Sequence, residues 1–71
     1  MKVTGKIVFR DIDFGVWTLQ GDDGMSYQLA GADRKIKKDG ARAEVEGEID
    51  ERAVSAAMIG PIFRVTRYRF L

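Results

Sequence analysis

Hydrophobic and polar residues alternate with a period of two over much of the chain, and the alternation begins near its start. Between residues 2 and 9, Val3, Gly5, Ile7 and Phe9 occupy every second position. A period of two places these side chains on one face of an extended backbone, so the segment predicts a strand with one buried face. Gly5 permits the bend that a long strand needs when it serves both halves of a small barrel.

Two further strands are predicted over residues 16–20 and 25–29. Their apolar faces consist of Trp17, Leu19, Met25, Tyr27 and Leu29. Between them lies Gly21-Asp22-Asp23-Gly24, whose Asp-Gly pair is a hairpin signal because a tight primed turn needs residues that tolerate positive φ. These segments predict a three-strand meander.

The alternation stops between residues 30 and 40, where Ile36 is the only large apolar residue. Asp33 suits the N-cap of a short helix and Gly40 suits its exit. We expect a helix of one to two turns that closes one end of the core.

Alternation returns between residues 41 and 49. The positions expected inward are Ala43, Val45, Gly47 and Ile49, and those expected outward are Arg42, Glu44, Glu46 and Glu48. Residues 53–59 predict a short, weak strand, and Gly60-Pro61 interrupts it because proline cannot donate to a ladder.

The last strand, residues 62–70, changes parity part-way along. Phe63 and Val65 share one parity, whereas Tyr68 and Phe70 share the other. One extra residue near Thr66-Arg67 brings all four to the inside, so we predict a bulge there. The three arginines of this strand, Arg64, Arg67 and Arg69, then face outward.

Three meandering strands, a short helix and two further strands predict an all-β, five-stranded OB-fold-like Greek-key barrel with one short helix between strands 3 and 4. Residues 1–71 form a single domain in this interpretation. An SH3-like barrel is the alternative, although it lacks a helix at that place.

Several segments together resemble uncharacterised families of short bacterial OB-fold proteins. These segments are Gly15-Val16-Trp17-Thr18-Leu19, Gly21-Asp22-Asp23-Gly24, Asp39-Gly40, Val45-Glu46-Gly47 and Met58-Ile59-Gly60-Pro61. The resemblance covers nearly the whole chain and implies the barrel fold. It implies no activity and no functional residues.

Composition removes much chemistry from consideration. The chain has no cysteine and no histidine, which excludes thiolate nucleophiles and imidazole bases or ligands. Asp11, Asp13, Asp22 and Asp23 are better explained by turns than by a metal site. We therefore expect no enzymatic activity, no catalytic residues, no cofactor and no metal.

Twelve basic and eleven acidic residues give a formal net charge of +1, too small for a long-range field that attracts polyanions. The chain also lacks the apolar run of a signal peptide or membrane span, so we expect a cytoplasmic protein without membrane contact.

Nucleic-acid binding is possible but not favoured by the sequence. The residues that it would use are Lys6, Arg10, Arg64, Arg67 and Arg69. The glutamates of residues 44–48 are expected beside the arginines, and cross-strand ion pairs would neutralise much of the strip. The outward positions of the second and third strands hold neither an aromatic nor a basic residue.

The favoured hypothesis is a non-catalytic module for contact with a protein, including a second copy of the chain. Val54, Met58 and Ile62, with Val8 and Phe14, would form an apolar patch if they lie outside. The alternative that residues 53–62 simply close the barrel stays equally open at this point.

Overall fold

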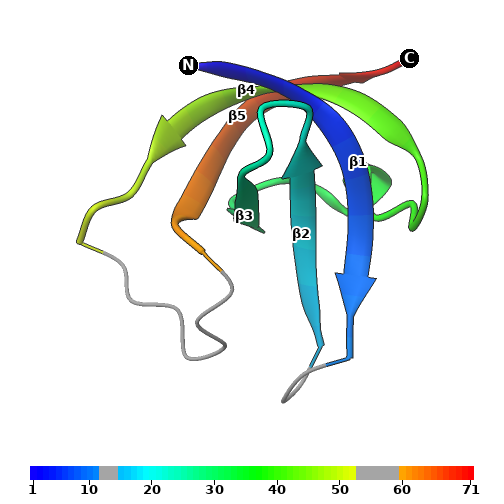
Figure 1. Ribbon diagram of the computed structural model, residues 1–71, viewed down its shortest axis with the longest axis horizontal. Helices are drawn as coiled ribbons and strands as arrows, with labels where there is room; N and C mark the ends of the chain where they lie inside the picture. Colours follow the sequence, from blue (N-terminus) through cyan, green and yellow to red (C-terminus); the bar gives the residue numbers. More distant parts are fainter. Residues whose placement is uncertain (12–14, 53–59) are drawn as a thin grey trace.

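A closed β-barrel accounts for nearly all regular structure of the described residues (Figure 1). The computed structural model describes residues 1–11, 15–52 and 60–71. The elements are β1 (Lys2–Arg10), β2 (Val16–Gly21), β3 (Ser26–Ala30), a single 3₁₀ turn η1 (Arg34–Ile36), β4 (Arg42–Ile49) and β5 (Ile62–Phe70). The predicted weak strand over residues 53–59 lies outside the described residues.

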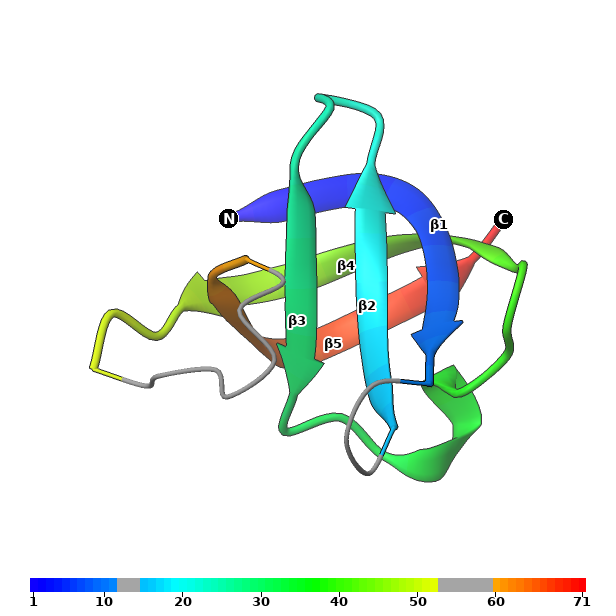
Figure 2. The same ribbon diagram turned by 60° about the horizontal axis from the view of Figure 1, so that its bottom comes forward.

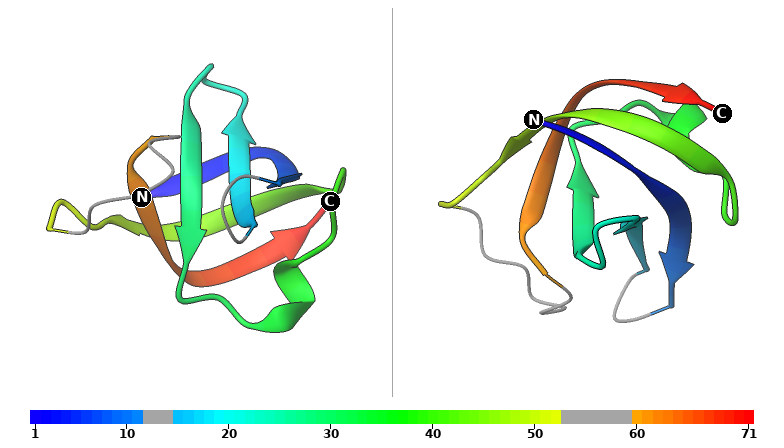
Figure 3. Two further views of the ribbon diagram at one scale, coloured as in Figure 1. Left: turned by 90° about the horizontal axis from the view of Figure 1, so that it is seen from below. Right: turned by 45° about the horizontal axis from the view of Figure 1, so that its top comes forward.

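The strand order around the barrel is β1-β2-β3-β5-β4, with β4 returning to pair with β1. All neighbours are antiparallel except β3 and β5, which run parallel. Figures 2 and 3 show β2 and β3 running across β4, whereas the first half of β1 runs beside β4. The predicted all-β class, five-stranded barrel and helical turn between β3 and β4 are confirmed.

β1 belongs to both halves of the barrel. It pairs with β4 through Lys2–Lys6 and with β2 through Gly5–Arg10, so Gly5 has a partner on each side. The strand curves strongly between these two sets of partners (Figure 1). This arrangement confirms the role that the sequence predicted for Gly5.

The core contains the side chains that the alternation placed inside. The largest fully buried apolar side chains are Ile7, Leu19, Ile36, Val45 and Phe63. The Tyr27 and Phe63 rings meet edge to face, with centroids 5.5 Å apart. Ile36 comes from η1, so the short helical turn closes one end of the core as predicted.

Three positions differ from the simple pattern. Phe9 is 40% exposed although its parity is inward, because it lies near the end of β1 where the barrel opens. Met25 is 50% exposed because it lies between the hairpin loop and the start of β3, outside the strand. Thr18, expected outside, is fully buried, and its hydroxyl donates to the Val8 carbonyl at 2.9 Å, which satisfies the buried polar group.

The β2–β3 hairpin has a three-residue loop, Asp22–Gly24. The Gly24 amide donates to the Gly21 carbonyl, and the Gly21 amide donates to the Met25 carbonyl, at 3.0 and 2.8 Å. Gly24 has φ of 86°, so the positive φ expected of the Asp-Gly pair is present. Three-residue loops of this kind place glycine in the left-handed region after the turn.

The bulge predicted in the last strand is confirmed. Glu46 lies opposite Arg67 and Gly47 opposite Val65, so Thr66 is the extra residue of β5. Across it, Val65 is buried and Tyr68 and Phe70 pack against the core. A Cβ atom at Gly47 would lie 2.0 Å from the Arg64 carbonyl oxygen, so the two strands approach more closely there than any side chain allows.

We predict that Gly47→Ala destabilises the fold by about 1 to 3 kcal/mol, because the new methyl group forces β4 and β5 apart. Chemical denaturation followed by circular dichroism measures this change. Glu48→Ala, at the next and exposed position, is the matched control and should change stability by less than about 0.5 kcal/mol. Equal effects of the two substitutions would contradict the close approach.

Candidate functional site: a charged face and an aromatic barrel end

The arginines of β5 face outward, as predicted, and each has an acidic partner. Arg67 pairs with Glu46 at 2.7 Å and Arg69 with Glu44 at 3.6 Å. Arg64 pairs with Asp50, which follows β4, although Glu48 is its partner in the strand register. The expected neutralisation by β4 is therefore present, with Asp50 taking the third position.

The surface formed by these ion pairs, which we call the charged face, is extended around the barrel by further pairs. Lys2 lies 3.7 Å from Glu44, and Arg42 lies 2.6 Å from Asp22 in the hairpin loop. The hydrogen bond from Arg67 lowers the pKa of Glu46, as the hydrogen bond from Arg42 does for Asp22. These carboxylates stay ionised beside their partners, so the charged face offers little unbalanced positive charge to a phosphate chain.

The two remaining residues of the predicted nucleic-acid strip lie on β1, where Lys6 is opposite Arg42 of β4 and Arg10 is opposite Val16 of β2. Lys6 is exposed and has no ion pair within the described ranges. Arg10 is partly buried, and its Nε atom is enclosed without a hydrogen-bond partner in the described part of the chain. The five predicted residues therefore do not form one strip.

The apolar patch predicted from the sequence is only partly described by the structure, and one of its members is buried. Ile62 is only 9% exposed because it packs at the start of β5, so it does not present an apolar surface. Val54, Met58 and Phe14 lie outside the described residues. Val8 is partly buried on β1.

The aspartates near the turns serve as hydrogen-bond acceptors. Asp23 accepts from the Met25 amide and from the Tyr27 hydroxyl, both at 2.9 Å. Burial, and then the bond to Asp23, raise the pKa of Tyr27. Within residues 1–11, 15–52 and 60–71, no group of three or more acidic residues is placed to hold a metal ion. Asp13 lies outside these ranges.

A second candidate surface lies where β1 ends, β2 begins and the segment with η1 crosses the barrel (Figure 2). The Phe9 and Trp17 rings lie 5.1 Å apart at a tilt of 55°. Trp17, Val16 and Lys37 line one hollow there, and Arg10 lies opposite Val16 in the β1–β2 ladder. We call these five residues, Phe9, Arg10, Val16, Trp17 and Lys37, the barrel-end site.

Two aspartates hold the segment between β3 and β4, which contains η1 and Lys37, against the barrel. Asp33 caps η1 by accepting from the Lys35 amide at 3.0 Å and also accepts from the Tyr68 hydroxyl of β5. Asp39 accepts from the Phe9 amide of β1 at 2.9 Å. The barrel-end site is thus built on connections to two strands, although η1 itself is a single turn.

The charges around the barrel-end site are unbalanced. Among the described residues of this end, the cations are Arg10, Arg34, Lys35, Lys37 and Lys38, and the carboxylates are Asp11, Asp33 and Asp39. None of these cations has an ion pair in the described part of the chain. Lys38 instead lies 4.7 Å from the centroid of the Phe70 ring. Asp33 and Asp39 are occupied by the hydrogen bonds described above.

Sequence reasoning did not find this site. It placed Phe9 and Trp17 on inward faces and predicted only a short helix around Ile36. A usable signal was present, since Phe9 is the last inward residue of its strand and precedes a turn-rich segment. An inward residue at a strand end lies at the mouth of a small barrel, where burial is incomplete.

Comparisons with protein-family models, with curated proteins and with solved structures give no match for this chain. The resemblance to short bacterial OB-fold families therefore stays a prediction. No helix in the described residues has the length and apolar character needed to cross a membrane.

The Asp33–Tyr68 bond gives a pH prediction. This bond raises the pKa of Tyr68 to about 12 and lowers the pKa of Asp33. Because the pKa of Tyr68 is raised, its contribution to stability is complete below pH 10 and is lost as the pH rises through about 12. Because the pKa of Asp33 is lowered, its contribution is lost as the pH falls through that lowered pKa. Site-resolved NMR titration should show Tyr68 ionising at a pKa nearer 10 in Asp33→Asn. An unchanged Tyr68 titration in that variant would contradict the bond.

Proposed function

We propose that this chain is a non-catalytic binding module whose working surface is the barrel-end site, and that its partner carries negative charge. The observation that supports this proposal is the uneven distribution of paired and unpaired basic side chains over the described part of the molecule. Five of its basic side chains have acidic partners on the charged face, whereas the five at the barrel end have none in the described residues.

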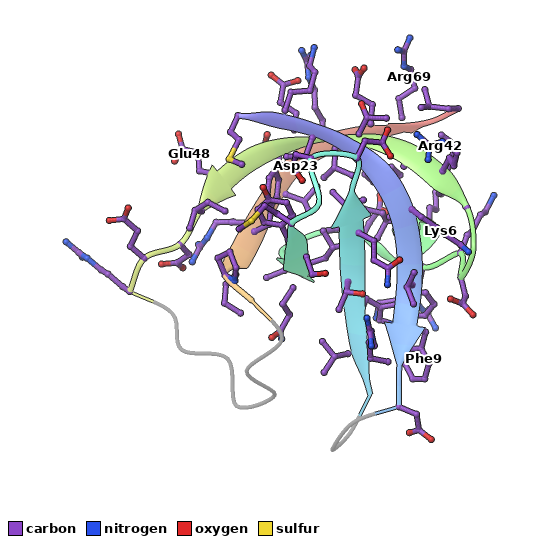
Figure 4. All side chains as sticks on the ribbon, in the orientation of Figure 1. Lys6, Phe9, Asp23, Arg42, Glu48 and Arg69 are labelled. Atoms are coloured by element: carbon purple, nitrogen blue, oxygen red, sulfur yellow. The ribbon has the colours of Figure 1, made fainter. Side chains whose placement is uncertain are left out.

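The composition of the barrel-end site also supports binding. Aromatic residues and arginine are enriched at interfaces because they provide large contact areas with a polar group at the edge. Phe9 keeps 40% of its surface exposed beside the half-buried Trp17. Figure 4 shows Phe9 at the end of β1, across the molecule from Arg69 on the charged face. An anionic partner bound at the barrel end could contact the aromatic side chains and the unpaired cations together.

The absence of histidine and cysteine supports a non-catalytic role, because it leaves few groups able to act as a base or nucleophile near neutral pH. The non-catalytic binding role favoured by the sequence is retained here with a different surface from the one first expected. A cytoplasmic location belongs to the same proposal.

The proposal predicts that polyanions bind at the barrel end and not at the charged face. Trp17 is the only tryptophan of the chain, so its fluorescence reports binding directly. Titration with poly-L-glutamate and with single-stranded oligonucleotides at low salt should change this fluorescence for at least one probe. Arg10→Gln and Lys37→Gln should each weaken that binding several-fold.

Arg67→Gln and Arg69→Gln are the matched controls, since they remove the same charge from arginines that already have partners. They should leave the binding of polyanions nearly unchanged. Failure of both probes to bind at low salt, or a larger loss in the controls than in the barrel-end variants, would overturn the proposal.

A second copy of the chain is the second candidate partner. Glu48 and Glu51 are exposed and have no ion pair in the described residues. Glu48 lies on the opposite side of the molecule from Phe9 in Figure 4, so the contact between copies would be head to tail.

Sedimentation velocity from low micromolar to millimolar concentration tests this second candidate. Self-association through these charges predicts larger species at low salt that disappear at high salt and in Lys37→Gln. A monomer over the whole range would leave only a different molecule as the partner.

A further inference from the structure

We infer that the anionic partner of the barrel-end site is single-stranded nucleic acid, with a base stacked on the Phe9–Trp17 pair and phosphates held by Arg10 and Lys37. This inference rests on the proposed function and names its partner. It concerns a different surface from the arginines of β5, which the sequence had suggested for nucleic acid.

The aromatic pair distinguishes between anionic partners. An acidic peptide can pair with the lysines and arginines, but its carboxylates have no flat apolar group to cover a ring. Every nucleic-acid base has such a face, and stacking on an aromatic side chain is tolerant of sequence. Phe9 lies near the end of β1 and is 40% exposed, so part of its ring is open to a ligand.

The cations lie within reach of a backbone that carries such a base. Lys37 lines the same hollow as Trp17, and Arg10 is the next residue after Phe9 and lies opposite Val16. A nucleic-acid backbone bound at this end of the barrel would meet one cation from β1 and one from the residue after η1. A phosphate oxygen is a suitable acceptor for the guanidinium of Arg10.

The shape of the site favours single strands over duplexes. The bases of a duplex are stacked on one another and present only their edges, so they cannot cover a ring on the protein surface. Trp17 lines a hollow together with residues of β3 and of the segment that follows it, and the Phe9 ring packs against Trp17 beside that lining. A splayed base of a single strand can enter such a hollow.

The test is titration of Trp17 fluorescence with a single-stranded oligodeoxynucleotide, its duplex form and poly-L-glutamate over a range of salt concentrations. We expect quenching by the single strand. Two phosphate contacts predict that the logarithm of the binding constant falls with the logarithm of salt concentration with a slope of about −1.4. Lys37→Gln should reduce the size of this slope by about 0.7.

Phe9→Ala should weaken binding by about fivefold or more through the loss of stacking, whereas Phe9→Tyr should keep it because the ring remains. Arg67→Gln should bind like the unmodified chain. Thermal denaturation of each variant verifies its fold, and the Phe9→Tyr variant keeps the test decisive if Phe9→Ala is destabilised.

The possible results separate the two levels of the proposal. Binding of poly-L-glutamate without binding of the oligonucleotide would overturn the nucleic-acid assignment and leave the anionic partner in place. Equal affinity for the duplex, or full affinity in a folded Phe9→Ala variant, would overturn the stacking arrangement. Failure of all three probes at low salt would remove both proposals.

Discussion

The close approach of β4 and β5 is the constraint on which the rest of the structure depends. At Gly47 the backbone of β4 comes so near to the Arg64 carbonyl that no Cβ atom fits between the strands. The extra residue Thr66 in β5 lies at the same place in the ladder and changes the parity of the residues after it. Together they let one strand place aromatic side chains inside the barrel on both sides of the bulge.

The same bulge sets the charge pattern of the surface. Because Thr66 shifts the parity, Arg64 and Arg67 both face outward on either side of it, beside the acidic side chains of β4 and Asp50. Closure of the barrel therefore also neutralises the three cations of β5. The barrel end has no such neighbour strand, since the chain there consists of strand ends and the segment with η1. The unbalanced cations are left at the place where strand pairing stops.

Much of the fold could be predicted from the sequence, because alternation with a period of two determines which face of each strand is buried. The bulge was also predictable, since Phe63 and Tyr68 have opposite parity and both are too large and apolar to favour solvent. The pattern failed at Phe9 and Met25 because alternation does not say where a strand ends. It failed at Thr18 because burial of an outward side chain depends on what lies over the sheet.

The candidate site was less predictable, for a physical reason. Ion pairing depends on which residues of distant strands lie opposite one another, and the sequence predicted those of β5 because its neighbour could be inferred from the fold. Lys37 and Trp17 come from segments that no ladder joins, and they meet in one hollow through the path of the connection after β3. A residue such as Arg10 could be named from its charge, but only the assembled barrel shows that it lies opposite Val16 at the end of β1 and has no ion pair among the described residues.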